Sequence, residues 1–193
     1  MSTPLFSVVL GAGLMGRLLA HTLAQAGHRV QVHEAQGDDG QGSAARVAAA
    51  MLAPLAESAI TEMPVVRMGH HGLTRWPELI ATLPEPVFFQ QNGTLVLWHR
   101  QDAAEAKRFE SLLLRTQDQC PELPPTQRLD AQGLQALEPG MEQRFNQALY
   151  LPGEGQLDNR ELLASLLQGM TQLGVEVHWN SPASPEDFQA GLS

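Results

Sequence analysis

Three glycines near the N-terminus have the spacing of a turn that binds phosphate groups. Gly11, Gly13 and Gly16 form the pattern G-A-G-L-M-G. The first glycine allows a tight turn, the second lacks the Cβ atom that would keep a pyrophosphate from the backbone, and the third lets a helix pack closely on a sheet. The amides of Leu14 and Met15 would open that helix, where a partial positive charge attracts phosphate. These residue types predict a site for the phosphates of a dinucleotide.

An acidic residue follows the glycines at the distance expected for a ribose contact. Glu34 lies 23 residues after Gly11, close to the spacing at which a carboxylate reaches the hydroxyls of an adenosine ribose. A carboxylate accepts hydrogen bonds from free hydroxyls and disfavours a 2′-phosphate. The glycines and the acid together predict a site for NAD or FAD, which this unit alone does not distinguish. The alternative is a purely structural turn between a strand and a helix.

The segments around these residues predict the elements that must position them. Residues 6–10 are a short apolar run that predicts a buried strand, and residues 29–34 alternate as a second strand does. The segment 14–26 between them predicts a helix that ends at Gly27. Its apolar residues recur at helical spacing: Leu14, Leu18, Leu19, Leu23 and Ala26. Together these elements predict a β-α-β unit with parallel strands, and hence an α/β fold with a Rossmann-like sheet.

A second region of small residues follows, from Ser43 to Pro54. Small side chains allow the backbone to approach a large planar ligand closely. The alternative is the start of an alanine-rich helix that packs on the sheet. The residues alone leave both interpretations open.

Turn and cap signals organise the rest of the chain. Residues 58–83 predict a helical region that Pro77 should kink or restart. Asn92-Gly93, in the middle of residues 87–98, predicts a β-hairpin of two short strands. The expected helix caps are Asp102 with Glu105, Asp130, and Asp158 with Glu161. The helix that begins at residue 159 should end at Gly174, before a strand over residues 175–179.

The composition limits the class of protein. Hydrophobic residues make up 43% of the 193 residues, which is enough for a packed core. Twelve basic residues against 21 acidic ones give a net charge of −9, which argues against a nucleic-acid or anionic-membrane partner. Cys120 has no second cysteine to pair with, and His70-His71 have no third ligand at a metal spacing, so we expect no metal. Without a signal peptide or an apolar run of membrane-spanning length, we expect a cytoplasmic location.

Several stretches resemble one family in the same order along the chain. They are residues 11–34, Ala48-Ala49-Ala50-Met51-Leu52, Asn92-Gly93-Thr94-Leu95-Val96, and the run from Leu149 to Asp158. Together they resemble the D-amino-acid oxidase superfamily of FAD-dependent oxidoreductases, in particular the glycine oxidases of thiamine biosynthesis. The resemblance extends over essentially the whole chain.

The resemblance implies FAD as cofactor and assigns residues to it. Residues 11–16 and Glu34 would hold the ADP half of FAD. The residues that would line the ribityl and isoalloxazine portion are Ser43, Ala44, Ala49, Ala50 and Met51. The backbone of Ala183 would face the adenine. The family usually has glycine where this chain has Ala50, and more often valine where it has Ala183.

The resemblance also implies a domain organisation. A Rossmann-like FAD-binding domain would comprise residues 1–84 and 147–193. Residues 85–146 would be the first part of an inserted antiparallel α+β substrate domain, incomplete in this chain.

The chemistry implied by the resemblance is oxidation of a small amino acid or amine, such as glycine, sarcosine or a D-amino acid, to an imine. Molecular oxygen would take the electrons and yield hydrogen peroxide. The resemblance assigns no catalytic acid or base to this stretch.

The family's members are longer than this chain, so we expect a fragment that is inactive alone, binds FAD weakly and forms a homo-oligomer. A noncatalytic nucleotide-binding module remains an alternative. An NAD-dependent dehydrogenase would also fit the first 34 residues, although not the later stretches.

Overall fold

The computed structural model describes residues 5–40, 42–141 and 144–191, which pack into two compact units. Unit 1 comprises Met1–Ala50, Leu79–Phe88 and Asp158–Ser193, and unit 2 comprises Met51–Glu78 and Phe89–Leu157. The functional division of the chain at residues 84 and 146 stays a prediction.

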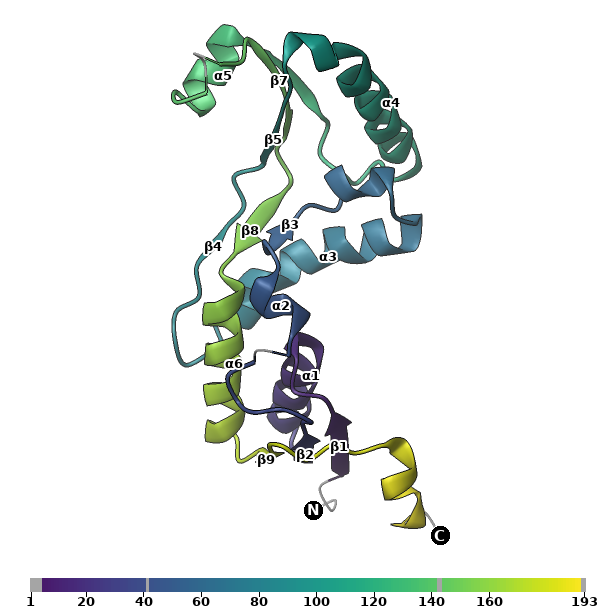
Figure 1. The fold of residues 1–193 in the computed structure, drawn as a ribbon, viewed down its shortest axis with the longest axis vertical. Coiled ribbons are helices and arrows are strands. Elements are labelled where there is room, and N and C mark those ends of the chain that lie inside the picture. The colour runs from purple at the N-terminus through teal and green to yellow at the C-terminus, as the bar shows by residue number, and fades with distance from the viewer. Residues whose placement is uncertain (1–4, 41, 142–143, 192–193) are drawn as a thin grey trace. The chain divides into compact units, whose positions relative to one another are not determined.

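Unit 1 is built on a three-stranded parallel sheet (Figure 1). Its strands are β1 (Phe6–Leu10), β2 (Arg29–His33) and β9 (Glu176–His178), in the order β1-β2-β9. Val9 stands opposite Val32 in the register of the first pair. The buried core beside the sheet consists of Val9, Ala12, Ala20, Val30, Val32, Met170 and Val175. The predicted parallel β-α-β unit is therefore confirmed.

Helix α1 (Leu14–Gln25) joins the first two strands and ends as predicted, because Gly27 adopts a φ of +87°. Its most buried side chains are not the apolar ones that recur at helical spacing. Arg17, Ala20 and His21 are buried, whereas Leu19 is 51% exposed, and Ala26 is exposed as well. Small Ala20 lets the helix lie close to the sheet, and a second helix covers the side that bears His21.

That second helix is α6 (Asn159–Gln172), which runs beside α1 in Figure 1. The Asp158 carboxylate caps it by accepting hydrogen bonds from the amides of Arg160 and Glu161. Glu161 does not complete a capping box, since its carboxylate accepts from the amide of Phe88 instead. Gly174 ends the helix at a φ of +75°, as predicted. Unit 1 also contains the short helix α2 (Ala44–Val47) and the 3₁₀ helix η3 (Pro185–Gly191).

Unit 2 contains two three-stranded antiparallel sheets, with the strand orders β3-β8-β4 and β5-β7-β6. The strands are β3 (Met51–Leu52), β4 (Phe89–Gln90), β5 (Thr94–Leu97), β6 (Gln127–Asp130), β7 (Gln147–Leu151) and β8 (Gly155–Leu157). The helices are η1 (Ala56–Ala59), α3 (Met63–Ile80, in unit 2 as far as Glu78), η2 (Arg100–Asp102), α4 (Ala103–Gln119) and α5 (Ala131–Leu137). One core cluster packs Leu55, Val66, Leu113, Cys120, Leu123, Leu149 and Leu151 together.

The predicted hairpin around Asn92-Gly93 is wrong. Strands β4 and β5 do flank this turn, but β4 pairs with β8 and β5 pairs with β7. Gly93 adopts a φ of +86° and donates its amide to the carbonyl of Glu154, 2.9 Å away. The hydroxyl of Tyr150 donates to the carbonyl of Asn92. The turn therefore carries the chain from one sheet to the other, and contacts distant in sequence decide its strand pairing.

The helix does not restart at Pro77, which lies inside α3 before its end at Ile80; a kink there stays a prediction. One expected cap differs from the structure. Asp102 makes no side-chain cap to α4, because η2 leads into that helix and leaves Asp102 at φ −96° and ψ 9°. The cap at Asp130 is confirmed, since its carboxylate accepts from the amide of Gly133 at 2.8 Å.

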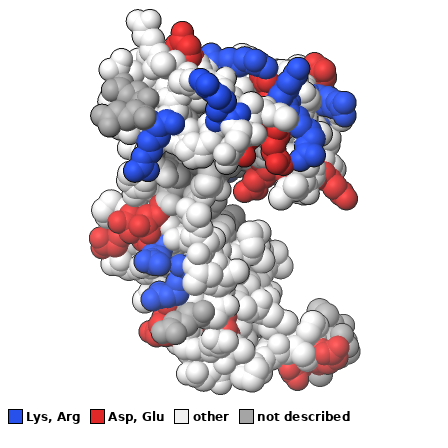
Figure 2. Space-filling model, turned by 45° about the horizontal axis from the view of Figure 1, so that its top comes forward, with Lys and Arg blue, Asp and Glu red and all other residues white. Residues whose placement is uncertain are grey.

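Charged side chains of both signs lie interspersed on the end of unit 2 that carries α4 (Figure 2). One exposed ion pair there joins Arg108 to Glu105 at 2.6 Å. Exposed pairs of this kind contribute little to stability. Among the described helices, none combines the length and apolar character needed to cross a membrane.

Candidate functional site

The glycine turn between β1 and α1 has a backbone that other residues would disrupt. Gly11 adopts a φ of +93°. A Cβ atom on Gly16 would lie 1.8 Å from the carbonyl oxygen of Gly11, which no rotation of a side chain could relieve. Glycine is therefore required at both positions for the strand and the helix to meet at this angle.

Gly13 has room for a ligand where a side chain would otherwise stand. It is the N-cap of α1 and has no side chain to cover the first amides of the helix. A Cβ atom there would lie 3.5 Å from Ser43 Oγ, an ordinary contact distance. The fold would thus accept a side chain at Gly13, but that side chain would stand over the helix N-terminus. The cradle predicted for a pyrophosphate therefore fits the residues present.

Glu34, directly after β2, is tied to the glycine turn. Its Oε2 atom accepts a hydrogen bond from the amide of Ala12 at 2.6 Å, and its Oε1 atom accepts from Gln36 at 3.0 Å. These bonds hold a half-buried carboxylate at the edge of a small cavity, where it could also accept from ribose hydroxyls. Gly13 and Ser43 line the same cavity. The structure thus brings together residues from three of the predicted segments.

Arg17 lines this cavity too, although the sequence analysis did not identify it. It is 2% exposed. Its guanidinium donates to the carbonyls of Ala12 at 2.7 Å, Leu163 at 2.8 Å and Asp38 at 3.3 Å. Burial lowers the pKa of Arg17, and the nearby carboxylates of Glu34 and Asp38 act in the opposite direction. Arg17 therefore joins the glycine turn to α6 and to the loop after β2.

The sequence alone did not mark Arg17 as a site residue. Arg17 lies three and four residues before Ala20 and His21, so it shares their helix face. Arginine is rarely buried without a carboxylate partner, and a pattern of apolar residues alone omits it. Trp179 also lines the cavity, with its ring 5.7 Å from the Arg17 guanidinium carbon.

The small-residue segment begins at Ser43, the N-cap of α2. After α2 the chain becomes extended at Ala48, and Ala50 adopts a φ of +55°. This left-handed conformation favours glycine, which explains physically why glycine would suit this position. Ala44 and Ala49 are exposed. Met51 begins β3 in unit 2, where it pairs with Gln156.

The segment that contains Ala183 runs beside the residues after β2. The amide of Ser181 donates to the carbonyl of Glu34 at 2.8 Å, and the amide of Asn180 donates to Gln36. Ala183 itself is half-buried. The chain therefore approaches the predicted ribose site from β9 as well.

Other reactive side chains form no second centre in the part of the chain that the structure describes. No three His, Cys, Asp or Glu residues there gather as a metal site would require. Cys120 is buried, and burial raises the pKa of its thiol. A cavity of about 620 Å³ in unit 2 is lined by residues of β5 and α4, including Phe109, and by Trp98 directly after β5. None of the predicted cofactor residues lines it.

The parallel sheet, the glycine turn and the tethered acid define a dinucleotide-binding α/β protein. Residues 7–189 match the model of the DAO family, described as FAD dependent oxidoreductase. The chain belongs to this family, whose cofactor is FAD. Because the family's cofactor is FAD, it excludes the alternative of an NAD-dependent dehydrogenase. The fold confirms the predicted α/β class.

A curated relative agrees with this assignment, and solved structures share the fold. A Rhizobium etli protein named as the thiamine biosynthesis oxidoreductase ThiO is 36% identical over 163 residues, which are 84% of this chain and 45% of that protein. Glycine oxidase from Geobacillus kaustophilus has a similar structure, with a TM-score of 0.74, 23% identity, and coverage of 90% of this chain and 46% of that one.

Iminodiacetate oxidase from Chelativorans sp. BNC1 is also similar, with a TM-score of 0.72 and 25% identity. The match covers 89% of this chain and 46% of the iminodiacetate oxidase chain. The chain thus spans somewhat less than half the length of these relatives.

Proposed function

We propose that this chain is the cofactor-binding part of an FAD-dependent oxidase that acts on a small amino acid or amine. One observation carries the proposal: the Glu34 carboxylate is hydrogen-bonded to the amide of Ala12, inside the glycine turn, in a chain that belongs to a family of FAD-dependent oxidoreductases. The relatives named as glycine oxidase and iminodiacetate oxidase support an amine next to a carboxylate as substrate.

Each part of the site has a role in this proposal. The amides of Leu14 and Met15 would face the pyrophosphate at the N-terminus of α1, where the helix dipole favours negative charge. Glu34 would accept hydrogen bonds from the adenosine ribose, and the backbone at Ala183 would face the adenine. The small residues Ser43, Ala44, Ala49, Ala50 and Met51 would leave room for the ribityl chain and the ring system.

The bound flavin would supply the two-electron oxidation of the substrate to an imine, with molecular oxygen as electron acceptor and hydrogen peroxide as product. The protein's own contribution would be to bind and align, which requires no acid or base from the residues of this chain. Glycine, sarcosine and D-amino acids are the substrates we propose.

Because the chain spans less than half the length of its relatives, we propose this activity for a complete enzyme. The chain alone should bind ADP, hold FAD weakly and produce no peroxide from glycine. Its cytoplasmic location, a homo-oligomeric state and the absence of a nucleic-acid partner stay predictions.

Binding of ADP and FAD by the purified chain tests the proposal. The fluorescence of Trp179 can report binding, because this residue lines the cavity. In the variant Gly13→Ala, the new methyl group should weaken both affinities about tenfold. The melting temperature should stay unchanged, since the methyl group meets the Ser43 side chain at ordinary contact distances, 3.5 Å to Oγ and 4.0 Å to Cβ.

The matched control is Gly72→Ala in helix α3, which does not line this cavity and where a Cβ atom meets nothing within 4 Å. Equal affinities for wild type and Gly13→Ala would contradict the proposed cradle. FAD binding by the complete enzyme without bleaching of its absorbance by glycine, sarcosine or a D-amino acid would favour a noncatalytic nucleotide-binding module instead.

A further inference from the structure

The single turn of α2 is not held in place by burial of its side chains. It comprises only Ala44–Val47, and none of these four residues, all of them described, is buried. Val47 is 81% exposed. A one-turn helix is unstable by itself, because helix nucleation costs more than one turn of hydrogen bonds returns. Contacts from elsewhere in unit 1 must therefore fix this segment.

Those contacts come from the N-terminus of α6. The side-chain amide of Asn159 donates its Nδ2 hydrogens to two carbonyls, those of Ala45 and Ala48, the latter at 2.7 Å. Arg160 adds a long hydrogen bond of 3.4 Å from Nε to the carbonyl of Arg46. These acceptors belong to the last turn and C-cap of α2, where carbonyls have no partner within the helix.

The chemistry of Asn159 suits this task. An amide nitrogen carries two hydrogens on a short, stiff side chain, so one residue can bridge two carbonyls three residues apart. Asn159 is 9% exposed, so its hydrogen bonds are largely shielded from water. An aspartate of the same size would present only oxygen atoms to the same carbonyls and would repel them.

The bridged segment leads directly into the residues assigned to the flavin. Ala48 is extended, with φ −67° and ψ 151°, and Ala50 is left-handed. A non-glycine residue stays left-handed only where its surroundings hold it. Holding the carbonyls of Ala45 and Ala48 in place therefore fixes the start of the backbone segment from Ala48 to Ala50.

We propose that Asn159 is a positioning residue that clamps α2 and so sets the backbone of Ala48–Ala50 against the flavin half of FAD. This inference rests on the proposed function, because it takes the small-residue segment as the flavin contact. A positioning role predicts a result that a general role in folding does not. Loss of the clamp should leave the binding of the ADP half, which the glycine turn holds, unaffected.

The first test measures the clamp without any cofactor. Trypsin can cut after Arg46, inside α2. In Asn159→Ala and Asn159→Asp, cleavage there should be at least about tenfold faster than in wild type, because local opening of the turn exposes the bond. Cleavage after Arg115, on α4 of unit 2, should be unchanged and serves as the internal control. Equal cleavage rates after Arg46 would overturn the clamp.

The second test measures the affinities of the same variants for FAD and for ADP. FAD affinity should fall about tenfold while ADP affinity stays within about twofold. The control Arg160→Ala, which loses only the long exposed bond, should change neither affinity. A parallel loss of both affinities, or no loss of either, would overturn the positioning role. A wild-type chain that binds ADP but no FAD would count against the proposed function, whereas trypsin cleavage would still decide the clamp.

Discussion

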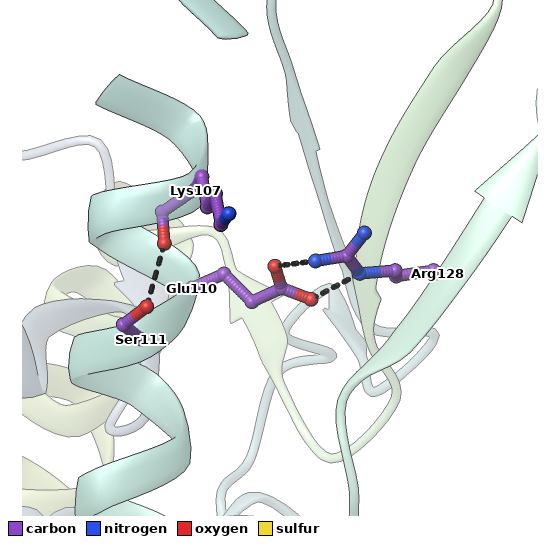
Figure 3. A network of polar contacts seen from close by, with 4 residues as sticks. All are labelled: Lys107, Glu110, Ser111 and Arg128. Atoms are coloured by element: carbon purple, nitrogen blue, oxygen red, sulfur yellow. Dashed lines mark hydrogen bonds and ion pairs between the residues drawn. The ribbon is translucent and has the colours of Figure 1, made fainter. Parts of the chain in front are cut away.

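Two sets of buried polar side chains, one in each unit, have different kinds of partner. In unit 1, Arg17 donates to backbone carbonyls of the glycine turn and of helix α6, and Asn159 donates to carbonyls in α2 and at its C-cap. In unit 2, Glu110 on α4 pairs with Arg128 on β6, as Figure 3 shows. These buried donors of unit 1 therefore hold backbone groups in place, whereas this pair in unit 2 joins a helix to a strand.

Exposure differs between the partners of that pair. The Glu110 side chain is 11% exposed and that of Arg128 is 72% exposed. The pairing with Glu110 raises the pKa of Arg128. Lys107, also drawn in Figure 3, uses its carbonyl to accept from the hydroxyl of Ser111 within α4. The comparison shows that a candidate site built mainly from backbone groups depends on side-chain donors, here Arg17 and Asn159, that do not belong to the glycine motif.

The largest expected effect contrasts the same substitution in the two units. Gly16→Ala should destabilise unit 1 by at least about 3 kcal/mol, because its methyl group would overlap the carbonyl of Gly11. Gly72→Ala, in helix α3 of unit 2 with nothing within 4 Å of the new Cβ, should instead stabilise by about 0.5–1 kcal/mol. Urea denaturation followed by tryptophan fluorescence measures both. Similar midpoints for the two variants would contradict the glycine turn as described.

The next effect is a pH dependence of opposite sign in the two units. Burial lowers the pKa of His21 in unit 1, so its contribution to stability is complete above about pH 6.5 and is lost as the pH falls through the folded-state pKa. Burial raises the pKa of Glu154 in unit 2, although its hydrogen bond from the amide of Ala56 opposes this. Its contribution is complete below about pH 4.3 and is lost as the pH rises through the folded-state pKa.

The chain has three tryptophans, so variants that keep only Trp179 or only Trp98 separate the two signals. Trp179 packs on the core of unit 1, and Trp98 packs on the core of unit 2. His21→Gln should reduce the loss of stability on acidification that Trp179 reports, and Glu154→Gln should reduce the loss at higher pH that Trp98 reports. If each variant changed the pH dependence of stability in the other unit, or if neither variant changed it in either unit, the contrast would be wrong.

The parts of the fold that could be predicted from the sequence depend on local geometry. Gly27 and Gly174 end helices because the backbone there needs a positive φ. Asp130 and Asp158 begin helices because their short carboxylates reach the next amides. The turn at Asn92-Gly93 had an equally strong signal, but strand pairing depends on distant partners, and these lie in two different sheets.

The candidate site shows the same division. The glycines and Glu34 can be recognised as a motif. Each is required either by the backbone conformation at its own position or by backbone that lies close to it. Arg17 and Asn159 could not be found this way, since their acceptors are carbonyls that the folded chain brings from elsewhere, such as those of Leu163 and Ala45. Carbonyls occur at every residue, so the sequence contains no sign of which ones a buried donor will reach.

The smallest expected effect tests whether the left-handed residue of unit 1 is strained. A left-handed alanine costs about 1–2 kcal/mol, whereas glycine in its place costs about 0.5–1 kcal/mol through the greater freedom of the unfolded chain. Ala50→Gly, at φ +55°, should therefore stabilise the protein by about 0.5 kcal/mol.

The matched control is Ala48→Gly, at φ −67°, which gains nothing from relief of strain and should destabilise by about 0.5–1 kcal/mol. Melting temperatures measured side by side resolve the opposite signs. If both variants destabilise equally, Ala50 is not held in the left-handed conformation in solution. The small-residue segment would then differ in shape between the free protein and this structure, and the expected effect of the Asn159 clamp on FAD affinity would shrink accordingly.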